Sequence, residues 1–177
     1  MIRRELVVAL TLWASASVAC VGPFGGSSKT PQADGLPLAA REELVKKWNN
    51  TWKPAAVEAQ AASCRTGAPA PAMVSADFDN DTLQDFALAV QTPDGVRLVA
   101  LLARGKEFKL VDVDELGKGE ATSFLGLEKR GVKFVDPASA AEDYFSSETL
   151  ATHRCGSVSR AYIWLGSSFR KVELKRS

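Results

Sequence analysis

Short β-type runs separated by turn residues follow one another after Met73, and they restrict the fold more than any other feature of the sequence. The runs cover residues 86–90, 96–103 and 108–113, with Pro93-Asp94-Gly95 and Arg104-Gly105-Lys106 between them. Turn residues between short apolar runs are typical of antiparallel strands joined by tight connections. The sequence therefore predicts an antiparallel meander here. Residues 159–165 and 169–174 flank Gly166-Ser167-Ser168 and predict a further hairpin.

The segment before the meander has a helical pattern. Apolar residues recur there at a spacing of three to four, namely Leu44, Val45, Trp48 and Trp52. This spacing predicts an amphipathic helix over residues 38–52. A second, alanine-rich helix is expected over residues 54–63, because proline is favoured at the first helical position. A short helix is also expected over residues 137–145. We interpret the two tryptophans as core residues packed on a sheet; the alternative is an aromatic surface that stacks a sugar.

These signals together predict an α+β domain in which N-terminal helices pack on an antiparallel sheet of meander and hairpin strands. A helical run followed by a series of strands argues against alternating βαβ units. Residues 38–177 remain once an N-terminal leader and tether at 1–37 are set aside, as described below. A length of about 140 residues is typical of a single domain with one core.

The first nineteen residues have the organisation of a secretory signal peptide. Arg3 and Arg4 give a short positive region, residues 6–13 are apolar, and small residues continue to Ala19. The apolar stretch is shorter than the roughly 20 residues that a membrane-spanning helix needs. We therefore expect export, with residues 1–19 removed from the mature protein.

Residues 17–20 resemble a bacterial lipobox, in which small residues precede a cysteine that becomes lipidated. Ser17 stands where leucine is usual, and Cys20 is the candidate lipidation site. Residues 20–37 are rich in Gly, Ser and Pro and predict a flexible tether between a lipid anchor and the domain. The expected location is the outer or inner membrane, facing the periplasm or the cell surface. The alternative is a secreted, soluble protein.

The remaining two cysteines, Cys64 and Cys155, form an even pair once Cys20 carries lipid. In an oxidising compartment such a pair indicates a disulfide. The alternative is a reactive thiol, because His153 lies two residues before Cys155. Lys plus Arg number 22 and Asp plus Glu number 21, so the chain lacks the basic excess of a nucleic-acid-binding protein.

The segment 77–85 carries the clearest chemical pattern. Aspartates occupy positions 1, 3, 5 and 9 of this nine-residue loop: Asp77, Asp79, Asp81 and Asp85. Calcium prefers six to eight oxygen ligands, and alternating aspartates in a tight loop aim several carboxylates at one point. The backbone carbonyl of Leu83, at position 7, is placed to add a further ligand. Thr82 and Leu88 stand where an EF-hand needs Gly and Glu, which excludes that motif.

The sequence from Asp77 to Ala87 resembles the DFDGDGxxDxA loop of FG-GAP repeats, the calcium-binding hairpins of integrin-type propellers. The resemblance implies that Asp77, Asp79, Asp81 and Asp85 are side-chain ligands, that Leu83 is a carbonyl ligand, and that the loop joins two strands. Asn80 and Thr82 replace the two glycines of the family pattern. The resemblance covers about a dozen to forty residues and occurs once in the chain, whereas a propeller needs about four blades or more. Several small exported bacterial proteins are similar to this chain in having one such loop and a final aromatic hairpin.

These observations lead to three functional hypotheses. The first is a calcium-stabilised cell-envelope lipoprotein that binds a protein or glycan partner without catalysis. The second is a periplasmic inhibitor of a hydrolase, with residues 117–123 as the protruding loop. The third is a small hydrolase that uses paired carboxylates, either Asp112 with Asp114 or Glu142 with Asp143. We expect no enzyme, because the single histidine and the lack of a Gly-x-Ser-x-Gly motif leave little catalytic machinery. For the acidic loop, the alternative to calcium binding is a solvated turn.

Overall fold

The computed structural model describes residues 35–55, 73–117, 123–136, 139–154 and 158–174. The predicted signal peptide, the tether up to residue 34, and the three cysteines Cys20, Cys64 and Cys155 lie outside these residues. Most of the expected second helix, and residues 118–122 of the proposed inhibitory loop, also lie outside them. No helix in the described ranges is both long and apolar enough to cross a membrane.

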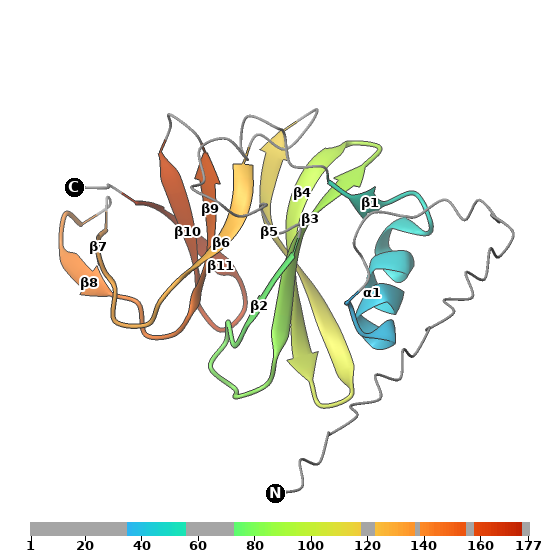
Figure 1. Ribbon diagram of the computed structural model, residues 1–177, viewed down its shortest axis with the longest axis horizontal. Coiled ribbons are helices and arrows are strands. Elements are labelled where there is room, and N and C mark those ends of the chain that lie inside the picture. The colour runs from blue at the N-terminus through green and yellow to red at the C-terminus, as the bar shows by residue number, and fades with distance from the viewer. Residues whose placement is uncertain (1–34, 56–72, 118–122, 137–138, 155–157, 175–177) are drawn as a thin grey trace, which may run out of the picture.

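The described chain consists of one helix followed by strands (Figure 1). The elements are α1 (Leu38–Trp48), β1 (Lys53–Pro54), β2 (Met73–Ala76), β3 (Asp85–Thr92), β4 (Gly95–Arg104), β5 (Glu107–Gly117), β6 (Ser123–Glu128), β7 (Lys133–Val135), β8 (Glu142–Tyr144), β9 (Thr149–Arg154), β10 (Ser159–Trp164) and β11 (Phe169–Leu174). The predicted meander is confirmed as β3, β4 and β5, which pair antiparallel in sequence order. The predicted C-terminal hairpin is confirmed as β10 and β11.

The expected fold class was wrong. Strands hold 57% of the described residues and the helix holds 10%, so the protein is mainly an antiparallel β structure and not helices packed on a sheet. A second helix was expected to begin at residue 54, but Lys53 and Pro54 form strand β1 instead. Only one side of the meander is covered by a helix. A second sheet covers the other side. The first sheet is apolar on both faces, so each face must be buried against another layer.

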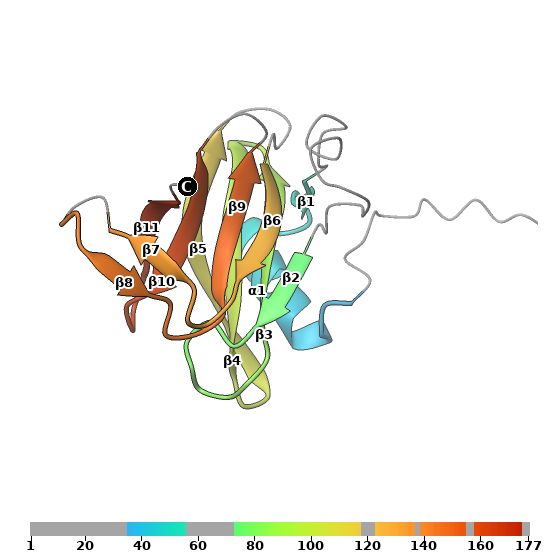
Figure 2. The same cartoon turned by 60° about the vertical axis from the view of Figure 1, so that its left-hand side comes forward.

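The strands form two main sheets and a separate hairpin. The first sheet has the order β1-β3-β4-β5, with β2 also paired to β3, and the second has the order β11-β10-β9-β6. β7 and β8 form the separate hairpin. Figures 1 and 2 show the two sheets face to face, with α1 on the outer face of the first sheet and the β7–β8 hairpin beside the second. The order of layers is therefore helix, sheet, sheet and hairpin.

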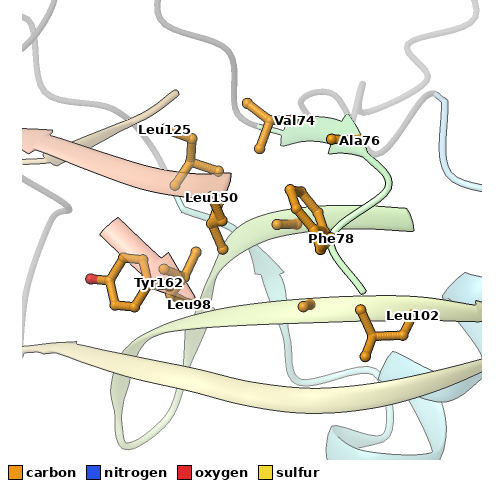
Figure 3. Packing of buried hydrophobic residues seen from close by; sticks show 10 residues of the cluster. Val74, Ala76, Phe78, Leu98, Leu102, Leu125, Leu150 and Tyr162 are labelled. Carbon is orange, nitrogen blue, oxygen red and sulfur yellow. The ribbon is translucent and has the colours of Figure 1, made fainter. Parts of the chain in front are cut away.

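The main core fills the space between the two sheets (Figure 3). The first sheet contributes inward-facing residues at alternate positions, and the second sheet contributes three large side chains. The labelled members are Val74, Ala76, Phe78, Leu98, Leu102, Leu125, Leu150 and Tyr162. Phe78 belongs to the acidic loop and not to a strand, and its buried ring fixes this loop to the core.

A second core lies between α1 and the first sheet. Leu44 of the helix is fully buried there against Val99 and Leu101 of β4, and Trp48 and Trp52 pack partly buried against the same cluster. This supports their interpretation as packing residues. The helix ends at Trp48, four residues earlier than predicted, because Asn49 adopts a positive φ of 50° and leaves the helical conformation.

The β7–β8 hairpin replaces the short helix expected over residues 137–145, and that expectation was wrong for the described part of the segment. Phe134 and Phe145 stack with their ring centroids 4.6 Å apart. Both pack on the outer face of the second sheet together with Ala161 and Val172. An extended hairpin delivers these two rings to one face, and burial of that face outweighs the weak local preference for helix.

A buried polar contact links the two sheets. The Tyr162 hydroxyl donates to Asp114 Oδ2 of β5 at 2.9 Å, and it lies 3.1 Å from Thr152 Oγ1 of β9. Lys171 of β11 adds a bond of 2.9 Å from Nζ to Asp114 Oδ1. Burial raises the pKa of Tyr162, so the hydroxyl keeps its proton and acts as a donor. This contact fixes how the second sheet is placed on the first.

We predict that Tyr162→Phe lowers the free energy of unfolding by about 1–3 kcal/mol, because Thr152 and Asp114 lose a partner in a site with almost no solvent. Urea unfolding would measure the change. Tyr144→Phe is the matched control, since Tyr144 is 60% exposed and should change stability by less than about 0.5 kcal/mol. Equal effects for the two substitutions would contradict this role for the Tyr162 hydroxyl.

Candidate metal centre

The acidic loop connects β2 to β3, and the antiparallel pair Ala76 and Asp85 closes it. This agrees with the prediction that the loop joins two strands. Phe78 anchors the inner side of the loop in the core, and the segment from Asn80 to Gln84 is exposed. One wall of the loop is therefore fixed by packing, and the other faces solvent.

Asp85 is fully buried, although it carries an ionisable side chain. Its Oδ2 accepts the Phe78 N–H at 2.9 Å, and its Oδ1 accepts the Ala103 N–H at 2.7 Å. The β3–β4 pairing ends at Phe86 and Leu101, so the Asp85 carboxylate satisfies a β4 donor just beyond the end of the ladder. Burial first, and then the charges of Asp79 and Asp81, raise the pKa of Asp85 to about 6, while the two backbone hydrogen bonds act to lower it.

Asp77 organises the exposed side of the loop. Its Oδ1 accepts the Asp81 N–H at 3.0 Å, and its Oδ2 accepts the Thr82 N–H at 2.9 Å. Short side chains of Asp commonly cap the backbone of the residues that follow them in this way. The two bonds wind the chain around the Asp77 carboxylate, so that the loop closes on its own first residue.

Asp79 has the most unusual environment in the loop. Its side chain is only 5% exposed, and its Oδ2 lies 2.6 Å from Nη2 of Arg104. Its Oδ1 is buried and has no hydrogen-bond partner among the described residues. A buried polar atom without a partner costs about 1–3 kcal/mol, and more where the group is charged. The arrangement therefore leaves one carboxylate oxygen free for a ligand.

Asp77, Asp79 and Asp85 form a group that could hold a metal ion, with one ligand atom from each lying within 4.8 Å of the others. Sequence reasoning placed all three in the site. It also placed Asp81 there, but Asp81 lies outside this group. Its Oδ1 accepts the Leu83 N–H at 2.9 Å, and its Oδ2 accepts a hydrogen bond from Arg104 at 3.1 Å. Leu83 stays a predicted carbonyl ligand, and its side chain is exposed.

Two neighbours of the site were missed by sequence reasoning. Arg104 appeared only as a turn residue, although its guanidinium pairs with Asp79 and Asp81. Phe78 appeared only as part of the motif, although it anchors the loop. Phe78 could have been found from the sequence, since it is a lone aromatic residue in a polar loop. Arg104 had no such signal, because it lies 23 residues from Asp81 in the chain.

The backbone of the loop is left-handed at Asn80 and Thr82, with φ values of 61° and 71°. These are the two positions where the FG-GAP pattern has glycine. Asparagine tolerates this conformation, but a β-branched residue such as threonine is strained in it. The loop thus has a left-handed conformation at Thr82 that is strained for threonine.

The carboxylates considered for hydrolysis do not converge. A bulge in the β4–β5 pairing between Leu98 and Val99 changes the register. Asp112 and Asp114 contact different layers of the fold. Asp112 forms an ion pair with Lys47 of α1, whereas Asp114 bonds to Tyr162 and Lys171 of the second sheet. In the β7–β8 hairpin, Glu142 pairs with Lys133, and Asp143 accepts the N–H of Tyr144.

His153 lies on β9 of the second sheet, whereas the acidic loop joins two strands of the first sheet. Its Nδ1 is 3.1 Å from Ser159 Oγ, and its Nε2 is 3.8 Å from Glu128 Oε1. Its ring also lies 5.2 Å from that of Phe124. The Cys155 thiol that was considered with it lies outside the described residues.

Comparisons with known proteins give no relative on which to base an assignment. No model of a protein family matches the chain, and no curated protein or solved structure matches it. The resemblance to the FG-GAP loop therefore stays a prediction.

We predict that the Asp85 carboxyl of the metal-free protein titrates with a midpoint near 6, against an ordinary value of 3.8. The folded pKa is raised, so this group stabilises the fold below pH 3.8, and the stabilisation is lost as the pH rises through 6. The chemical shift of the carboxyl carbon, followed by NMR in EGTA, would measure the midpoint. A midpoint near 3.8 would contradict the buried position of this group.

We predict that Thr82→Gly raises the free energy of unfolding by about 1 kcal/mol. Relief of left-handed strain, about 1–3 kcal/mol, exceeds the added backbone entropy of glycine, about 0.5–1 kcal/mol. Thermal unfolding in EGTA would measure the gain. Thr82→Ala is the control, because it keeps the Cβ and should recover only part of it. A loss of stability in Thr82→Gly would show that the position is not strained.

Proposed function

We propose that the acidic loop binds Ca²⁺ in a structural role, and that the ion braces an exported module that binds a protein or glycan partner. The observation that carries the proposal is the buried Oδ1 of Asp79, which has no partner among the described residues and belongs to a group of three converging aspartates. A hard divalent cation satisfies such an oxygen, and calcium accepts carboxylates in flexible geometries.

The charge balance of the loop supports a cation. Four aspartates lie within nine residues, and Arg104 is the one basic side chain that pairs with them in the described part of the chain. Like charges at such separations repel one another, and burial reduces the screening. The raised pKa of Asp85 reflects its burial first, and then the negative charges of Asp79 and Asp81. A bound divalent cation would lower this pKa and stabilise the loop.

A structural role fits better than a catalytic one. Asp77 and Asp85 already bond to the backbone, which fixes their orientation but places them inside the loop and not at an open reaction site. An ion between them would join the end of β2, the start of β3 and the end of β4, because Ala103 bonds to Asp85. The ion would therefore lock one end of the first sheet.

The proposed location and partner rest on the sequence. The signal-like residues 1–19, Cys20 and the tether support an envelope lipoprotein, in which a rigid module extends from a lipid anchor. Extracellular calcium is abundant enough for modules whose dissociation constants are as weak as about 10⁻⁴–10⁻³ M. The divergent directions of Asp112 and Asp114 give no support to a hydrolase.

We predict that calcium raises the thermal unfolding midpoint of the chain from residue 20 by several degrees, relative to EGTA. Calcium at a hundred times its dissociation constant contributes about 2.7 kcal/mol. Asp79→Asn should abolish the shift, because it removes the charge of the oxygen that lacks a partner. Scanning calorimetry at several calcium concentrations would measure it.

Asp94→Asn is the matched control for this experiment. Asp94 is exposed in the turn between β3 and β4, at the other end of the first sheet, and it carries the same charge. Its substitution should leave the calcium shift unchanged. Absence of any shift in the wild-type protein at ten millimolar calcium, about ten times the weakest dissociation constant expected, would refute the calcium site.

A further inference from the structure

Arg104 lies directly against the candidate metal centre. It is the last residue of β4, and its guanidinium contacts two aspartates of the loop. Nη2 is 2.6 Å from Asp79 Oδ2, and Nη1 is 3.1 Å from Asp81 Oδ2. Nη1 also donates to the carbonyl oxygen of Ala103 at 2.6 Å, which holds the planar group in place. The guanidinium thus bridges positions 3 and 5 of the loop.

The two bridged aspartates are not equivalent. Asp79 belongs to the group of three converging carboxylates, whereas Asp81 lies outside it. Both oxygens of Asp81 are engaged, one by the N–H of Leu83 and the other by Arg104. Asp81 is the one predicted carboxylate ligand that the structure keeps away from the group, and Arg104 is the side chain that holds it there.

We infer that Arg104 is a built-in competitor of the metal ion, which holds Asp79 and Asp81 in the metal-free protein and is displaced when calcium binds; this inference rests on the proposed function of the loop. Arginine keeps its charge at all ordinary pH values, so the guanidinium stays a cation wherever the aspartates are ionised. The guanidinium holds Asp79, which belongs to the converging group, and Asp81, which the sequence pattern predicts as a ligand. Two cations so close together also repel each other.

Displacement is feasible because Arg104 is only half-buried. Its side chain is 41% exposed, so the guanidinium can turn into solvent without losing its hydration. Loss of the Arg104 contact frees Oδ2 of Asp81, which can then join the ion as the fourth carboxylate that the sequence pattern predicts. The energy of breaking the two ion pairs lowers the calcium affinity. Arg104 therefore acts as a positioning residue that sets the calcium concentration at which the loop fills.

The test is calorimetric titration of the chain from residue 20 with calcium chloride, comparing wild type with Arg104→Gln and Lys106→Gln. Lys106 is the matched control, because it lies in the same β4–β5 turn, carries the same charge, is exposed, and forms no ion pair with the described part of the loop. We expect Arg104→Gln to tighten calcium binding by roughly ten-fold or more. Lys106→Gln should change it by less than about three-fold, because solvent screens the exposed lysine.

A second readout follows the guanidinium itself. NMR signals of the Arg104 Nη protons should be resolved in EGTA, where hydrogen bonds restrict rotation, and should collapse when calcium is added. Unchanged signals on calcium binding would overturn the inference, as would equal affinity gains in both variants or weaker binding in Arg104→Gln. Calcium binding by Arg104→Gln but not by wild type would also overturn it, because the guanidinium would then block the site and not be displaced by the ion. If neither protein binds calcium, the proposed function and this inference both fail. If wild type binds calcium but Arg104 does not compete with the ion, only this inference fails.

Discussion

The Asp85 carboxylate is fully buried, and its two oxygens accept backbone hydrogen bonds from residues 7 and 18 positions away in the chain. These bonds hold the acidic loop against the end of β4, just beyond the last β3–β4 pair. Moving an ionised carboxylate out of water is unfavourable unless charge or hydrogen bonds compensate it. The raised pKa of Asp85 shows that the compensation within the loop is incomplete. A cation at this position would complete it, and the rest of the account depends on this imbalance.

The loop also connects the chemistry of the site to the packing of the whole molecule. Phe78 lies between Asp77 and Asp79 and enters the core shared by both sheets, to which Tyr162 also belongs (Figure 3). A change in the conformation of the loop would therefore disturb the central core and not only an exposed turn. This coupling explains why an ion in the loop would stabilise the whole domain, and why Arg104 beside it can set the affinity.

Turn residues and the spacing of aspartates predicted local structure correctly, whereas helical signals did so only for part of α1. The turn residues around Gly95 and Gly105 predicted the meander, and the spacing of aspartates predicted three residues that converge.

Pairings between distant segments were not predictable. β6 pairs with β9, with Phe124 opposite His153, and this pairing completes the second sheet that made the α+β expectation wrong. The short helix was wrong for the same reason, since Phe134 and Phe145 find their partners on distant strands. Arg104 was missed because its contact with the loop exists only after β3 and β4 pair.

The most direct test of calcium binding is a crystal structure grown with millimolar calcium, with the ion located by its anomalous scattering. We expect one strong peak among the carboxylate oxygens of Asp77, Asp79 and Asp85, at calcium–oxygen distances of about 2.3–2.6 Å. We also expect that the Arg104 guanidinium has left Asp81. A well-ordered loop without a peak, with Arg104 still bound to Asp79 and Asp81, would contradict the account and leave the aspartates as a hydrogen-bonded turn.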